Sequence, residues 1–179
     1  MSDPWKKSKD WADKYFPDIC AIIQELAGEI IDIKKADIND DIYRATDFVV
    51  RAKTGNIAGR IRKLKYFEEF GDFTLRYSRP SGVKTELQKI REGFANWYLY
   101  SWADPKMIQA WIFVDLECLR KSGILDNPQK LPKSRNPSDG TTFVSISIDD
   151  LDKNGCIKRK KGNFKTRLDS AREEDEADG

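Results

Sequence analysis

Alternating apolar and polar side chains in two short segments constrain the fold of this chain more than any other feature. Between residues 72 and 79 every second side chain is apolar, and between residues 57 and 64 isoleucines alternate with arginines. Successive side chains of a β-strand point to opposite faces of the sheet, so both segments are predicted strands with one buried face and one polar face. The polar face of the predicted sheet would carry Arg60, Arg62 and Arg76.

Helix and strand signals elsewhere predict an α/β fold of the α+β kind, with a central mixed sheet of about five strands flanked by helices. An apolar stripe predicts a helix that starts at Pro17 and reaches Ile33, and a second helix is expected after Pro80 and Ser81. The other expected elements are strands over 43–51, 96–102 and 109–115 and a short helix over 116–122. The predicted order is therefore a helix, three strands, a helix and two strands.

The 179 residues fit a single domain, which we expect over residues 1–156. Its core is predicted over 18–123, followed by a proline-rich loop over 124–142 and a final strand over 143–148. From residue 157 onward a basic run is followed by an acidic run, a pattern typical of a charged, flexible C-terminal tail. This tail, 157–179, is either a solvated terminus or a nonspecific phosphate-binding arm.

The composition excludes several kinds of catalysis and indicates a location. The chain has no histidine, which excludes histidine-dependent nucleophilic catalysis and histidine metal sites. Its three cysteines, Cys20, Cys118 and Cys156, are far apart in the sequence and are expected to be reduced thiols of a cytoplasmic protein. No apolar run is long enough to span a membrane and the N-terminus lacks a secretory signal, so we expect no association with membranes.

The polar face of the predicted sheet has two interpretations. Asp47 interrupts an otherwise apolar strand and is the natural counter-ion of the three arginines. One face of an antiparallel sheet is often simply exposed to water. Alternatively, the arginines form a phosphate-binding surface, because guanidinium groups match phosphate oxygens, and Lys84 would extend its positive charge. Three aromatic residues of one strand either belong to the core or stack on bases: Tyr98, Tyr100 and Trp102.

The order of predicted elements resembles that of the PD-(D/E)XK, or restriction-endonuclease-like, superfamily, in particular its compact Holliday-junction-resolvase-like and phage-type members. In that superfamily a helix glutamate precedes a strand that begins with an aspartate, and the next strand carries Glu-x-Lys. Asp47, in the sequence Thr-Asp-Phe-Val-Val, matches the strand aspartate, and Glu29 is similar in position to the helix glutamate. The Glu-x-Lys position reads Arg60-Ile61-Arg62, so this motif is degenerate.

The resemblance implies a metal-dependent DNA endonuclease in which the next helix supplies the missing acidic residue. Glu86 would then bind Mg²⁺ together with Asp47, while Lys89, one helical turn further along, and Glu29 would assist catalysis. A bound metal ion neutralises the charge that develops on the phosphate and lowers the pKa of the attacking water. The remaining predicted nucleic-acid-binding residues would hold the neighbouring phosphates: Arg60, Arg62, Arg76 and Lys84.

Two other functions fit the same sequence. The first is a module that binds nucleic acid or a nucleotide without a metal, through the arginines and the basic run. The second is an interaction protein, such as a phage-type inhibitor of a host enzyme, in which acidic segments contact the partner. Glu29 and Glu86 are equally compatible with ordinary exposed helix glutamates. The expected partner is DNA, and both a homodimer and a protein partner stay open.

Overall fold

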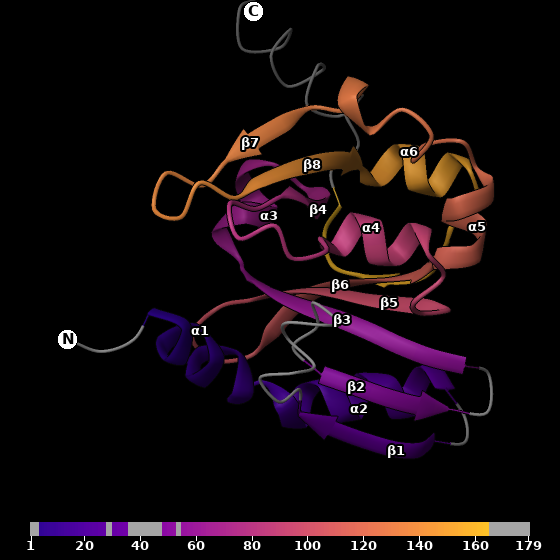
Figure 1. Ribbon diagram of the computed structural model, residues 1–179. Helices are drawn as coiled ribbons and strands as arrows, with labels where there is room; N and C mark the ends of the chain where they lie inside the picture. Colours follow the sequence, from indigo (N-terminus) through magenta and orange to yellow (C-terminus); the bar gives the residue numbers. More distant parts are fainter. Residues whose placement is uncertain (1–3, 28–29, 36–47, 53–54, 165–179) are drawn as a thin grey trace, which may run out of the picture.

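The computed structural model describes residues 4–27, 30–35, 48–52 and 55–164, which form helices and strands arranged around two β-sheets (Figure 1). The helices are α1 (Pro4–Asp13), α2 (Phe16–Ala27), α3 (Lys65–Glu69), α4 (Glu86–Arg91), α5 (Leu116–Lys121), α6 (Ile148–Lys153) and the 3-10 helix η2 (Pro128–Lys130). The strands are β1 (Ile30–Lys35), β2 (Phe48–Ala52), β3 (Gly55–Lys63), β4 (Asp72–Ser78), β5 (Trp97–Ala103), β6 (Ile108–Asp115), β7 (Lys133–Arg135), β8 (Thr142–Ser147) and β9 (Ile157–Lys161). None of the described helices is both long and apolar enough to cross a membrane.

The large sheet is mixed and six-stranded, in the order β1-β2-β3-β5-β6-β9, and the second sheet has three antiparallel strands in the order β4-β8-β7. β3 and β5 run parallel, whereas the other neighbouring strands of the large sheet are antiparallel. Between β3 and β5 the chain leaves the large sheet to form α3, β4 and α4, because two parallel strands require a crossover connection. The predicted α+β fold with a central mixed sheet is confirmed, and that sheet has six strands rather than five.

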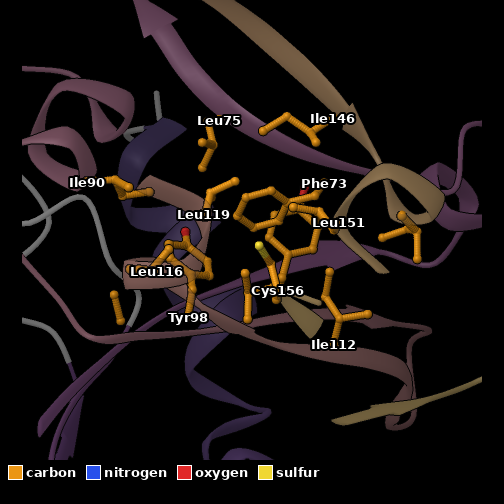
Figure 2. Packing of buried hydrophobic residues seen from close by; sticks show 14 of the residues in the cluster. Phe73, Leu75, Ile90, Tyr98, Ile112, Leu116, Leu119, Ile146, Leu151 and Cys156 are labelled. Carbon is orange, nitrogen blue, oxygen red and sulfur yellow. The ribbon is translucent and has the colours of Figure 1, made fainter. Parts of the chain in front are cut away.

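Two hydrophobic clusters lie on opposite faces of the large sheet. On one face, Ile57 and Ile61 of β3 belong to the same cluster as Ile19 of α2. Arg60 and Arg62 alternate with these isoleucines, so β3 directs them to the other face, toward the second sheet. There the larger cluster fills the space between the two sheets and helices α4, α5 and α6 (Figure 2). Its members include Phe73, Leu75, Ile90, Tyr98, Ile112, Leu116, Leu119, Ile146 and Leu151.

The first long helix is shorter than its sequence predicts, and the remainder of its apolar stripe is a strand. α2 ends at Ala27, and residues Ile30–Lys35 form β1, which pairs antiparallel with β2. Isoleucine is β-branched and favours strands, which agrees with a strand at this segment in place of a longer helix. β2 and β3, which follow each other in the chain, are adjacent and antiparallel. Glu29 and Asp47 lie outside the described residues.

The segment predicted as the third strand of the central sheet belongs instead to the second sheet. After β3 the chain forms α3, and Gly71, with φ at +57°, then leads into β4, which pairs with β8. A positive φ at the end of a helix favours glycine, because a Cβ atom would be strained there. Arg76 of β4 is thus on a different sheet from Arg60 and Arg62.

Helix α4 begins at Glu86, later than the start at residues 80–81 that the sequence predicts. Thr85 is the N-cap residue: its hydroxyl accepts a hydrogen bond from the Gln88 N–H (3.3 Å), and the Gln88 side chain accepts one from the Thr85 N–H (2.7 Å). This capping box satisfies two N–H groups that the first turn of a helix leaves without partners. With this start, α4 buries Glu86 and Lys89.

The C-terminal part contains more regular structure than expected. The predicted loop over 124–142 includes η2 and β7, and the strand that follows is not the last, since α6 and β9 come after it. β9 contains the basic run of residues 158–161 and pairs with β6 at one edge of the large sheet. The basic run therefore belongs to the sheet and not to a tail. Residues 165–179, which hold the acidic run, lie outside the described residues.

Cys118 and Cys156 form a disulfide, so the expectation of reduced thiols is wrong for these two residues. Their Cα atoms are 5.3 Å apart although 38 residues separate them in the chain, because α5 packs beside the start of β9. Cys156 is fully buried in the larger hydrophobic cluster. The disulfide therefore joins α5 to the residue that directly precedes the edge strand β9. Cys20 is a free cysteine, and burial raises the pKa of its thiol.

Replacing both bonded cysteines with alanine, Cys118→Ala and Cys156→Ala, should lower the free energy of unfolding by about 3–4 kcal/mol, because the bond restricts the unfolded chain over a long loop. Urea unfolding under oxidising conditions measures this change. Cys20→Ala is the matched control and should change the free energy of unfolding by less than about 1.5 kcal/mol. If the double variant were as stable as the parent protein, the disulfide would be contradicted.

Candidate functional site

The three arginines predicted to share one face do come together, but from two different sheets. Arg60 and Arg62 of β3 both lie over the ring of Phe143 in β8, with their Cζ atoms 5.9 and 5.7 Å from its centroid. Arg76 of β4 is the register partner of Phe143 across the second sheet, so their side chains leave the same face of that sheet. We call Arg60, Arg62, Arg76 and Phe143 the arginine cluster.

A buried carboxylate, that of Glu86 on α4, lies beside the arginine cluster. Its Oε2 atom is 3.0 Å from Nη1 of Arg60, and the Glu86 and Arg60 side chains are only 2% and 10% exposed. Nη1 is within ion-pair distance, although it is not aligned for a hydrogen bond. Oε2 also accepts a hydrogen bond from the backbone N–H of Arg76 (3.0 Å), and Oε1 accepts one from the hydroxyl of Tyr98. Both oxygens of the carboxylate therefore have partners inside the protein.

The burial of Glu86 and Lys89, and the position of Arg60 beside Glu86, affect their predicted roles in metal binding and catalysis. Neither is an exposed helix residue, since they are 2% and 5% exposed. A cation bound to Glu86 would lie next to the guanidinium of Arg60, and like charges at short distance repel each other. In the part of the chain that the structure describes, no three Cys, Asp or Glu side chains are grouped so that they could hold a metal ion. Because Asp47 and Glu29 lie outside that part, magnesium binding stays a prediction.

Arg62 has aromatic rings as neighbours where Arg60 has a carboxylate. Its side chain is half-buried, and its Cζ atom lies 4.7 Å from the centroid of the Tyr66 ring and 5.7 Å from that of Phe143. Among the described residues, none forms an ion pair or hydrogen bond with the Arg62 side chain. Aromatic faces attract a cation without using the N–H donors that lie in the guanidinium plane. Arg62 is therefore oriented and still able to bind an oxyanion.

The aromatic residues singled out in the sequence are core residues. Each of the three is 1% exposed: Tyr98, Tyr100 and Trp102. The core interpretation is therefore confirmed, and stacking on bases would require these rings to leave the protein interior. Tyr66 and Phe143 are the rings that contact the guanidinium groups, and no pattern in the sequence predicts these contacts. Phe143 becomes recognisable only when β8 is placed beside β4, which pairs it with Arg76.

The last predicted phosphate-binding residue, Lys84, is separate from these contacts. It is exposed and forms an ion pair with Glu92 at 2.8 Å, just beyond the end of α4. Exposed ion pairs of this kind contribute little to stability because water screens both charges. Neutralising Glu92 in this exposed pair therefore provides a control for the effect on stability of neutralising the buried Glu86.

Comparison of the chain with protein-family models, with curated proteins and with solved structures finds no match. The resemblance to the restriction-endonuclease-like superfamily therefore rests on the sequence pattern and stays a prediction.

Glu86→Gln should lower the free energy of unfolding by about 3–5 kcal/mol, because it removes the buried negative charge that lies 3.0 Å from the guanidinium of Arg60. Glu92→Gln makes the same chemical change in the exposed pair with Lys84 and should cost less than about 1 kcal/mol. Chemical denaturation of the two variants, compared with the parent protein, measures both changes. Equal and small losses for the two variants would show that the Glu86 carboxylate is not a structural charge.

Proposed function

We propose that the protein binds the phosphate backbone of nucleic acid at the arginine cluster, as a binding module and not as a nuclease. The observation that carries this proposal is the contact of Arg62 with the rings of Tyr66 and Phe143, while its N–H donors are unengaged by the described residues. Guanidinium groups bind phosphate oxygens through two parallel hydrogen bonds, and a guanidinium that is already oriented loses less entropy on binding.

The charge of the surroundings supports binding of an anion. Arg60 and Arg62 place two guanidinium groups over the ring of Phe143, and among the described residues no carboxylate pairs with Arg62. The engagement of Glu86 by Arg60 also favours a binding module over a nuclease, because a magnesium ligand would have to give up that partner. DNA is the ligand we propose first, since its phosphate spacing offers neighbouring anionic groups.

The basic strand β9 is a weaker candidate for the phosphate contact. Lys158 lies 3.5 Å from the carboxylate of Asp115, and Lys160 lies 2.6 Å from that of Asp152, so half of its positive charge is balanced within the protein. The exposed residues Arg159 and Lys161 still add to the long-range positive potential, which speeds association with nucleic acid.

The location and the oligomeric state belong to the same proposal. We place the protein in the cytoplasm, where nucleic acid is available to it. Cytoplasmic reductants act on disulfides, so DNA binding should be measured both with and without reductant. A homodimer or a protein partner would appear as a larger species in size-exclusion chromatography coupled to light scattering.

Arg62→Gln should weaken binding of a fluorescently labelled DNA oligonucleotide about tenfold, because it removes a charge-assisted contact to phosphate. It should also reduce the slope of log affinity against log salt concentration by about 1. Fluorescence polarisation across a salt series measures both quantities. Lys121→Gln is the control: it removes one exposed positive charge from α5, which lies on the opposite side of the view from α3 (Figure 1), and should leave affinity unchanged.

The same assay separates the binding module from the nuclease. Affinity that is unaffected by EDTA, with intact DNA in Mg²⁺ or Mn²⁺, supports the binding module. DNA cleavage that needs either metal and is lost in Asp47→Asn supports the predicted nuclease instead. Absence of any salt-sensitive binding, with the protein folded, contradicts both.

A further inference from the structure

Helix α3 and its C-cap residue Phe70 carry three aromatic rings, one in contact with Arg62, one packed toward the core and one exposed. Phe67 packs inward, with its ring centroid 5.0 Å from those of Trp102 and Phe164. Tyr66 and Phe70 are outside this contact: Tyr66 is half-buried beneath Arg62, and Phe70 is 61% exposed. The core contact of α3 is thus supplied by Phe67, and the exposed ring of Phe70 is free to serve another purpose.

Phe70 is the C-cap residue of α3 and follows Tyr66, whose ring contacts Arg62, by four residues. Its backbone N–H donates a hydrogen bond to the carbonyl oxygen of Tyr66 (3.2 Å), so Phe70 closes the last turn of α3, one helical turn from Tyr66. The face of the Tyr66 ring is occupied by cations, with Arg62 at 4.7 Å and the Nζ atom of Lys65 at 5.0 Å from its centroid. A ligand phosphate on Arg62 would therefore bring its attached sugar and base near Phe70.

We propose that the nucleic acid bound at the arginine cluster is single-stranded, with one base stacked on Phe70 and a neighbouring phosphate on Arg62. This inference rests on the proposed function. Bases of a duplex are already stacked on each other, so an exposed ring can add affinity only for an unpaired base. Stacking on a ring tolerates every base, so little sequence preference is expected.

The charges on α3 indicate that this helix would contact a base and not a phosphate. Lys65 is accompanied by Glu68 and Glu69, all three of them exposed, so the helix has no excess of positive charge to attract phosphate. Electrostatic attraction comes from the arginine cluster, and the helix adds a flat apolar surface. Loss of Phe70 should therefore change affinity without changing its dependence on salt, unlike loss of Arg62.

The test compares Phe70→Ala with the parent protein on labelled single-stranded and duplex oligonucleotides of the same sequence. Phe70→Ala should weaken single-strand binding about tenfold, within the range for removal of one stacking ring, and leave the salt slope and duplex binding unchanged. Phe70→Tyr should retain the parent affinity. Met107→Ala is the matched control, because Met107 is also a large exposed apolar residue (52%) but lies on the turn between β5 and β6. Phe70→Ala should unfold at the same temperature as the parent protein, since the ring is exposed.

A second readout tests the stacked base directly. A single-stranded oligonucleotide with abasic sites should bind the parent protein as weakly as it binds Phe70→Ala. The inference is overturned if Phe70→Ala binds single strands like the parent protein, or if it loses duplex and single-strand affinity equally. If Arg62→Gln still weakens binding in that case, the proposed phosphate site stands without the base contact. If neither strand form binds the parent protein, both proposals fail.

Discussion

The buried carboxylate of Glu86 is the interaction on which the arrangement of the two sheets depends. One side chain of α4 contacts Arg60 of β3, the backbone of Arg76 in β4 and the hydroxyl of Tyr98 in β5. A carboxylate removed from water costs several kcal/mol unless its charge is balanced and its oxygens are hydrogen-bonded. Any other placement of the second sheet against the large sheet would leave this charge without one of its partners. The carboxylate therefore favours one relative position of α4, β3, β4 and β5.

This ion pair also divides the arginines of β3 into two kinds. Arg60 is almost fully buried and its charge is balanced inside the protein by Glu86. Arg62, two residues further along the same face of β3, is half-buried and contacts the rings of Tyr66 and Phe143. The first guanidinium stabilises the contact between the sheets, and the second is held in place at the surface. The guanidinium that we propose for phosphate binding thus lies two residues from a structural ion pair on the same strand.

Local patterns predicted those elements whose side chains alternate or repeat clearly. β3, β5, β6 and α5 fall where the sequence indicates them, because each has one apolar face or stripe that any packed arrangement must bury. The isoleucines of Ile30–Lys35 were ambiguous, since helix and strand both bury such residues. β9 was missed because a lysine-rich strand at the edge of a sheet, where charge prevents pairing with other chains, has the same composition as a solvated tail. The disulfide was missed because 38 residues separate Cys118 from Cys156.

The sequence by itself determined that the chain contains a sheet with Arg60 and Arg62 on one face, and that no histidine chemistry is available to it. Only the tertiary structure decided that Glu86 lies against Arg60, that Phe143 lies beneath both guanidinium groups, and that Arg76 comes from a second sheet. The physical reason is the range of the interactions. Alternation along a strand follows from the local geometry of the backbone, whereas the partner of a buried charge depends on how distant segments pack to remove that charge from water.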